Sequence, residues 1–119
     1  MRDNSRASIA FLATKILLPS FGNTSMYDYG ARQYVFFTFQ KSVSRLSVYD
    51  YGRRCYISGY GNSYYDYGRH SFIRIENVKN NSLIGYDYET HSHFSASIRN
   101  QTLWMYDYEN RQYYSYGLG

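Results

Sequence analysis

The chain has 119 residues and a formal net charge of +4, with 21% aromatic and 18% charged residues. This length suffices for one domain that buries a hydrophobic core. Its single cysteine, Cys55, excludes an intrachain disulfide, and other repeats of the chain have serine or glutamine in its place, which favours an unreactive thiol. The charge is mildly basic and the cations are spread along the chain beside acids, so nucleic acid is an unlikely partner.

Residues 1–24 differ in composition from the rest of the chain. Ala7 to Leu18 is an apolar run with three polar interruptions. Such a run is too short to cross a bilayer, so we predict no transmembrane segment, although its charged start and apolar middle resemble a secretory signal. Its apolar positions fit one face of a helix and equally the alternation of a strand, so we expect either a helix or an added strand that ends at Pro19.

The rest of the chain is organised around the tripeptide Tyr-Asp-Tyr. It occurs five times, at residues 27–29, 49–51, 65–67, 86–88 and 106–108, with starts 22, 16, 21 and 20 residues apart. Recurrence at a nearly constant period is typical of a repeat protein. We therefore expect residues 25–119 to form one tyrosine-rich repeat domain.

Each repeat has the pattern of a β-hairpin. Around each tripeptide the tyrosines alternate with aliphatic residues and the aspartate, which predicts one aromatic face and one aliphatic face ending in a carboxylate. After a short turn a second strand is expected, over residues 33–39, 55–59, 71–75, 93–99 and 112–116. Five tandem hairpins of about 20 residues predict an all-β antiparallel meander of about ten strands. The pattern leaves open whether the sheet is an open curled sheet, a barrel or a sandwich.

The motif aspartates are expected to stabilise the turns. We expect each to accept hydrogen bonds from turn N–H groups and to face the cation four residues later, as in the pairs Asp28 with Arg32, Asp50 with Arg54, and Asp107 with Arg111. Asp66 and Asp87 have histidines at that position. Because the copies are equivalent, they do not resemble a catalytic pair of carboxylates, and we predict no catalytic residues.

Glu89, His91 and His93 have a spacing that would bring a carboxylate and two imidazoles to one face of a strand. No other repeat reproduces this trio, so neither a metal site nor a cofactor is predicted.

The segment Tyr27-Asp28-Tyr29-Gly30-Ala31-Arg32-Gln33-Tyr34 resembles the core sequence of bacterial Rhs proteins, whose Tyr-Asp (YD) repeats have a similar period. The resemblance implies an antiparallel β-sheet that coils as repeats accumulate. It is strong over this octapeptide and elsewhere extends to the period and the tyrosine-aspartate pair.

Regular copies without a unique polar constellation favour a non-enzymatic protein with a structural or adhesive role. The alternative is a carbohydrate-binding module, because flat aromatic surfaces stack on sugar rings. Its contact residues would be Tyr49, Tyr51, Tyr65, Tyr67, Tyr86 and Tyr88.

Self-association through the edges of the sheet is expected. The last predicted strand is aromatic and uncharged, which leaves an unprotected edge at Tyr113, Tyr114 and Tyr116. The apolar N-terminal segment could add to that edge in a neighbouring copy, producing homo-oligomers or filaments. The sequence does not identify a compartment; a bacterial source would favour secretion or the cell surface.

Overall fold

The computed structural model describes residues 1–119, which form one helix followed by ten strands. The helix α1 spans Asp3–Leu17. The strands are β1 (Ser25–Asp28), β2 (Gln33–Lys41), β3 (Leu46–Asp50), β4 (Cys55–Tyr60), β5 (Ser63–Asp66), β6 (Ser71–Val78), β7 (Ser82–Asp87), β8 (Ser92–Arg99), β9 (Thr102–Asp107) and β10 (Gln112–Gly117). Every regular element after residue 24 is a strand, as the period-two pattern predicts.

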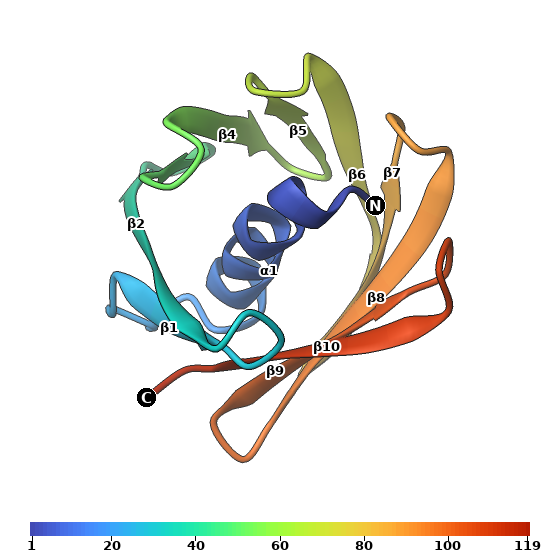
Figure 1. The fold of residues 1–119 in the computed structure, drawn as a ribbon. Coiled ribbons are helices and arrows are strands. Elements are labelled where there is room, and N and C mark those ends of the chain that lie inside the picture. The colour runs from blue at the N-terminus through green and yellow to red at the C-terminus, as the bar shows by residue number, and fades with distance from the viewer.

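The ten strands form a closed antiparallel barrel, seen end-on in Figure 1. Each strand pairs with its neighbours in sequence, and β10 pairs with β1 to close the sheet. The predicted meander of hairpins is therefore confirmed, and of the three arrangements left open the chain adopts the barrel.

Closure changes the environment of the last strand. β10 pairs with β9 along its whole length and with β1 where Tyr116 lies opposite Asp28 and Gly117 opposite Tyr27. The prediction that Tyr113, Tyr114 and Tyr116 lie on an outermost strand is wrong, because β1 occupies the position that a second copy was expected to take. Self-association stays a prediction, but without this free edge to act through.

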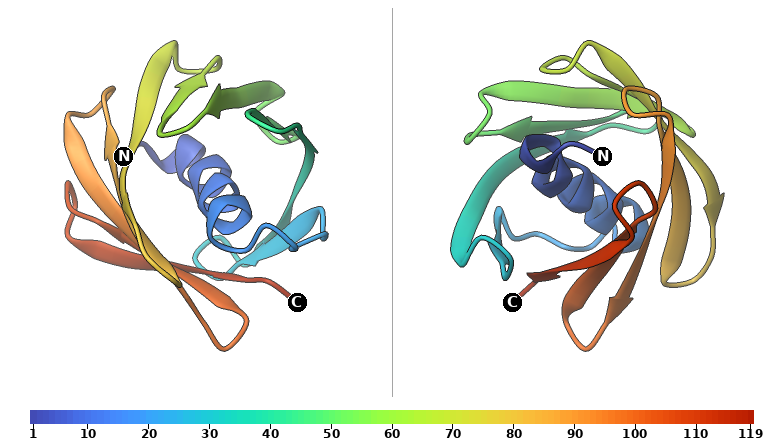
Figure 2. Two further views of the ribbon diagram at one scale, coloured as in Figure 1. Left: turned by 180° about the vertical axis from the view of Figure 1, so that it is seen from behind. Right: turned by 45° about the vertical axis from the view of Figure 1, so that its right-hand side comes forward.

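The helix α1 lies inside the barrel, as Figures 1 and 2 show. Strand side chains alone can fill a barrel of about eight strands, whereas a wider barrel leaves space in its lumen. Here α1 fills that space: Ile9, Phe11 and Leu12 are at most 1% exposed, and Phe11 stacks on Phe37 of β2 at 4.4 Å between ring centroids. The N-terminal segment is thus a helix that completes the core of the barrel. No helix of the chain has both the length and the apolar character needed to cross a membrane.

Alternation along the strands decides which side chains face this core. In β3, Leu46, Val48 and Asp50 are buried, whereas Ser47 and Tyr49 between them are half-buried. The same alternation recurs in β7 and β9. The motif aspartates therefore face the lumen and the motif tyrosines face outward, as the sequence pattern predicts.

One close approach in the wall requires a glycine. Gly85 of β7 lies opposite Phe94 of β8, whose ring packs over it. A Cβ at residue 85 would lie 2.8 Å from both Cε atoms of that ring, which is closer than van der Waals contact allows. Glycine here lets Phe94 reach the core, where it is fully buried.

The five turns that follow the motifs lie together at one end of the barrel, because each connects an odd-numbered strand to the next. In every turn the motif aspartate uses Oδ1 to accept a backbone N–H, which stabilises the turn in the way expected for this residue. The bonds run from Ala31 to Asp28 (3.0 Å), from Gly52 to Asp50 (2.8 Å), from Gly68 to Asp66 (2.9 Å), from Glu89 to Asp87 (3.0 Å) and from Glu109 to Asp107 (3.0 Å).

The cations of these turns do not form the expected pairs. Arg32, Arg54 and Arg111 have φ of 57°, 56° and 57°, in the left-handed region that closes the turn. Their side chains are exposed to solvent, whereas the carboxylates of Asp50 and Asp107 point toward the lumen and pair with Arg53 and Arg6. Asp28 forms no ion pair. The prediction that these three arginines pair with Asp28, Asp50 and Asp107 is wrong, because the two ends of each turn direct their side chains to opposite sides of the wall.

Candidate binding surface

The outer face of the barrel carries five clusters of aromatic rings, one in each hairpin, which we call the aromatic triads. Each contains both tyrosines of one motif and the ring that lies across the hairpin from the first tyrosine. The triads are Tyr27, Tyr29 and Tyr34; Tyr49, Tyr51 and Tyr56; Tyr65, Tyr67 and Phe72; Tyr86, Tyr88 and His93; and Tyr106, Tyr108 and Tyr113. Most of the rings meet edge to face, a favourable geometry for aromatic pairs.

Smaller side chains separate several neighbouring triads. In three triads the first tyrosine faces a ring within its own hairpin but a small polar residue on the preceding hairpin, whereas Tyr86 faces Arg74 there. Thus Tyr49 lies opposite Thr38, Tyr65 opposite Ser58, and Tyr106 opposite Ser95. Because large and small residues alternate around the barrel, the spaces between hairpins form grooves bordered by aromatic rings.

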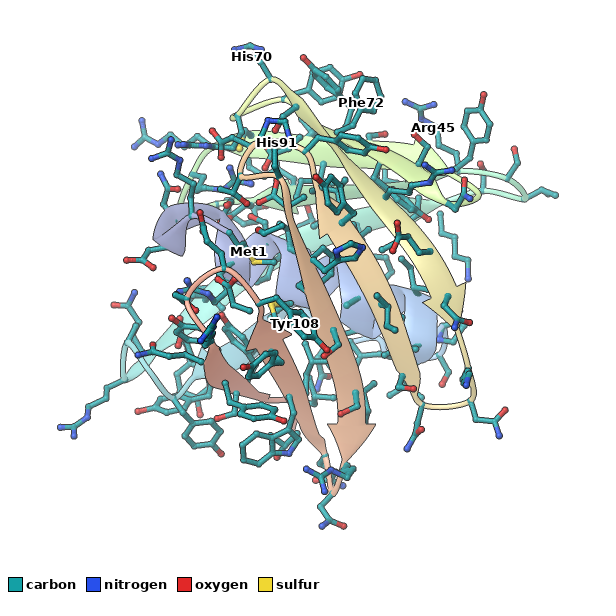
Figure 3. The ribbon with its side chains drawn as sticks, turned by 90° about the vertical axis from the view of Figure 1, so that its right-hand side faces the viewer. Met1, Arg45, His70, Phe72, His91 and Tyr108 are labelled. Atoms are coloured by element: carbon teal, nitrogen blue, oxygen red, sulfur yellow. The ribbon has the colours of Figure 1, made fainter.

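Two such grooves meet at Phe72 on the outer surface of β4, β5 and β6, and we call them the Phe72 grooves. The first has a volume of about 520 Å³ and is lined by Arg45, Ser58, Tyr60, Asn62, Tyr65, Tyr67 and Phe72, among others. The second has a volume of about 480 Å³ and is lined by Asn62, Ser63, Ser71, Phe72, Arg74 and Tyr88. Figure 3 shows Phe72 and Arg45 on the outside of the barrel, in the upper part of the view, and both line the first groove. The volumes of both Phe72 grooves lie within the usual range for sites that bind small ligands.

The Phe72 grooves combine exposed rings with polar groups. Phe72 is 52% exposed and Tyr67 is 50% exposed, so their rings are available to a ligand. Arg45, from the loop between β2 and β3, lines the first groove, and Arg74 of β6 lines the second. Nη1 of Arg74 donates a hydrogen bond to the hydroxyl of Tyr88 at 3.3 Å. The Phe72 grooves thus bring together aromatic rings for stacking, hydroxyl and amide groups, and guanidinium donors.

The structure brings together only part of the tyrosine set expected to contact a sugar. Tyr65 and Tyr67 line the first groove and Tyr88 lines the second. Tyr86 lies across from Arg74 in the sheet, whereas Tyr49 and Tyr51 belong to the neighbouring triad. Arg45 and Arg74 were not among the site residues expected from the sequence. The alternation of apolar and polar residues along β6 could have predicted that Arg74 lies on the outer face. No feature of the local sequence relates Arg45 to Phe72.

The largest groove, about 700 Å³, lies at the seam where β1 meets β10. The triad of Tyr27, Tyr29 and Tyr34 borders it together with the side chains of Asn23 and Gln101. No charged side chain lines this groove. It has aromatic rings and amides but lacks the guanidinium groups of the Phe72 grooves.

Inside the barrel three of the motif carboxylates form ion pairs with arginines. Arg6 of α1 lies 3.4 Å from Asp107, and Arg53 of the second turn lies 3.4 Å from Asp50 and 3.0 Å from Asp66. The hydroxyl of Ser8 on α1 contacts both Asp50 and Arg53. These carboxylates face the N-terminal half of α1, where the positive end of a helix dipole favours negative charge. Their arrangement therefore orients the helix within the barrel.

The remaining candidates from the sequence are the Cys55 thiol and the trio of Glu89, His91 and His93. Burial raises the pKa of the Cys55 thiol, an effect that the nearby Arg53 opposes, and a raised pKa lowers its reactivity at neutral pH. Glu89 pairs with Arg69 at 2.7 Å and His93 pairs with Glu76 at 3.0 Å, whereas His91 lies in an exposed turn position. No group of three potential ligands lies within metal-binding distance.

Comparisons with protein-family models, with curated proteins and with solved structures found no match to this chain. Function therefore has to be inferred from the chemistry of the outer surface. On that surface, the Phe72 grooves are where exposed rings, hydroxyl groups and two exposed guanidinium groups meet.

Proposed function

We propose that this protein is a non-enzymatic carbohydrate-binding module with an adhesive role, and that it binds its ligand in the Phe72 grooves. The observation that supports this most directly is the half-exposed ring of Phe72 between two grooves of about 520 and 480 Å³. A single ring that serves two adjoining grooves suits a chain of linked sugar units.

The groove walls match the surface of a sugar. A pyranose ring has apolar C–H faces that pack on an aromatic ring, and hydroxyl groups around its edge that form hydrogen bonds. Phe72 and Tyr67 offer exposed rings, while Ser63, Ser71 and Asn62 supply hydroxyl and amide groups to the walls. Each of these polar groups can both donate and accept hydrogen bonds, as sugar hydroxyls require.

The position of the acids favours binding over hydrolysis. Glycosidases generally use two carboxyl groups that flank the scissile bond. No aspartate or glutamate lines either of the Phe72 grooves, and Asp66, the motif acid of the same hairpin, is 2% exposed and directed into the lumen. A saccharide in these grooves would meet rings and cations without a pair of carboxylates.

The scaffold keeps the grooves rigid. Antiparallel pairing places Tyr65 opposite Phe72, and Phe72 precedes Ile73, which is 1% exposed in the core. Side chains on a packed sheet lose little conformational freedom when they bind, which favours affinity.

Binding of the purified protein to a glycan array, followed by calorimetry with the best ligand, tests the proposal. We expect Phe72→Ala to reduce affinity by about tenfold or more, in the range expected when a ring that stacks on a ligand is removed. The absence of binding to any glycan by the wild-type protein would refute the proposal.

Tyr113→Ala provides the matched control. Tyr113 holds the same place in its triad as Phe72 and is 70% exposed, but it lines neither of the Phe72 grooves. We expect this variant to bind like the wild type. Equal losses in both variants would contradict the assignment of binding to the Phe72 grooves.

A further inference from the structure

We infer that the ligand of the Phe72 grooves is an acidic polysaccharide, whose carboxylate or sulfate groups are bound by Arg45 and Arg74. The inference rests on the proposed carbohydrate-binding function and specifies its ligand. It follows from how the fold distributes charge between the lumen and the outer surface.

The barrel buries a larger share of its acids than of its cations. Four of the nine acidic residues, Asp50, Asp66, Asp87 and Asp107, are buried at the end of the lumen. The exposed arginines and lysines other than Arg2 form no ion pair. A net charge of +4 therefore understates how positive the outer surface is, because the barrel buries four acids but only two of the thirteen arginines and lysines, Arg6 and Lys15.

Two of the free cations border the Phe72 grooves. Arg45 lines the first and Arg74 the second, and both are exposed. The one hydrogen bond recorded for the Arg74 side chain, to Tyr88, engages Nη1 and leaves the guanidinium's other N–H groups for a ligand. Guanidinium forks match the planar geometry of a carboxylate and also bind sulfate oxygens.

The exposed acid that follows Arg74 on β6 forms no ion pair with it. Glu76 follows Arg74 by two residues on β6, but its carboxylate lies 3.0 Å from the Nε2 of His93 and lines neither groove. The field in the grooves is therefore positive, which favours a ligand that carries negative charge.

A polysaccharide fits this arrangement better than single-stranded nucleic acid. Bases need freely accessible ring faces along a continuous cationic track. The Phe72 grooves contain two cations, Arg45 and Arg74, which do not form a continuous track. The groove walls also carry hydroxyl and amide groups, which suit a saccharide.

Calorimetry of the full chain with matched polymers tests the inference. Polygalacturonate is compared with its fully methyl-esterified form, which has the same backbone without charge, and dextran sulfate is compared with dextran. We expect the better of the two anionic polymers to bind about tenfold or more tightly than its neutral counterpart, with an affinity that falls as salt increases. Which pair shows the difference identifies carboxylate or sulfate as the charged group.

Paired variants locate the effect. We expect Arg45→Gln combined with Arg74→Gln to reduce the ratio of the affinities for the anionic polymer and its neutral counterpart from about tenfold or more to about one. Arg54→Gln combined with Arg111→Gln removes the same charge from turns outside the grooves and should preserve the preference. Equal effects of the two double variants would overturn the inference.

The remaining outcomes separate this inference from the proposed function. Equal binding of charged and neutral polymers would overturn the acidic ligand but leave carbohydrate binding intact. Tighter binding of oligothymidylate than of either anionic polymer would overturn the inference in favour of nucleic acid. If none of these polymers bound and the glycan array were also negative, the proposed function itself would fail.

Discussion

Arg53 and Asp66 connect two neighbouring hairpins, with Nη2 of the guanidinium 3.0 Å from Oδ2 of the carboxylate and Nη1 3.3 Å from Oδ1. The pair is almost fully buried, with 11% of the Arg53 side chain and 2% of the Asp66 side chain exposed. Buried charges depend on their partners, because loss of one leaves the other desolvated without compensation. Arg53, in the turn of the second repeat, thus compensates the charge of Asp66 in the third repeat and allows that carboxylate to be buried.

Asp66→Asn should lower the free energy of unfolding by about 3 kcal/mol, since the substitution leaves the guanidinium of Arg53 buried with only Asp50 as a charged partner. Urea denaturation at pH 7 measures the loss. Asp28→Asn is the matched control, because Asp28 has the same place in its motif but takes part in no ion pair. Equal losses in the two variants would show that the pair with Arg53 contributes nothing beyond the turn.

Asp87 should make stability depend on pH in the opposite way from a carboxylate in an ion pair. Burial raises its pKa above the ordinary value of 3.8, although the Glu89 N–H and the Thr90 hydroxyl oppose the shift. Between the ordinary and the raised pKa the folded protein holds a proton that the unfolded chain has released, so stability falls as pH rises through this interval.

Asn cannot ionise, so Asp87→Asn should remove this loss. We expect the variant to gain stability relative to wild type between pH 4 and pH 7, in urea denaturation at both values. A difference between variant and wild type that is the same at both pH values would contradict a raised pKa for Asp87.

Gly85→Ala should destabilise the barrel by about 1 to 3 kcal/mol, because the added methyl group meets the Phe94 ring and the packed core cannot move aside. Thermal unfolding measures the effect. Gly30→Ala is the control, since its nearest neighbour to a new Cβ is Oδ1 of Asp28 at 3.4 Å. Combining Gly85→Ala with Phe94→Leu should cost less than the sum of the single changes, and strict additivity would show that the ring is not the obstacle.

Substitution by glycine should have different effects on stability at the adjacent residues Arg53 and Arg54. Arg54 has φ of 56°, so Arg54→Gly relieves backbone strain and should leave the free energy of unfolding unchanged or raise it by up to about 1 kcal/mol. Arg53→Gly removes the cation between Asp50 and Asp66 and should cost about 3 kcal/mol or more. Chemical denaturation of both variants decides the point. A large loss of stability in Arg54→Gly would contradict this expectation and would indicate an ion pair between Arg54 and Asp50, which the structure does not show.

Local patterns were enough to predict the strands and the turns. The alternation in Leu46 to Asp50 shows which side chains share a face, because successive residues of a strand point to opposite sides whatever lies beyond them. The aspartate at the start of each turn was likewise predictable, since it bonds to backbone N–H groups two or three residues away.

The tertiary structure decided which distant residues meet. Pairing of Asp28 with Tyr116 closes the barrel, and closure makes a lumen in which α1 becomes the core. Once the aspartates face that lumen, their charge partners come from Arg6 and Arg53 and not from the exposed arginines of their own turns. The position of Arg45 beside Phe72 has the same origin. These contacts depend on the curvature and closure of the whole sheet, whereas the periodicity of a single strand depends only on its own backbone.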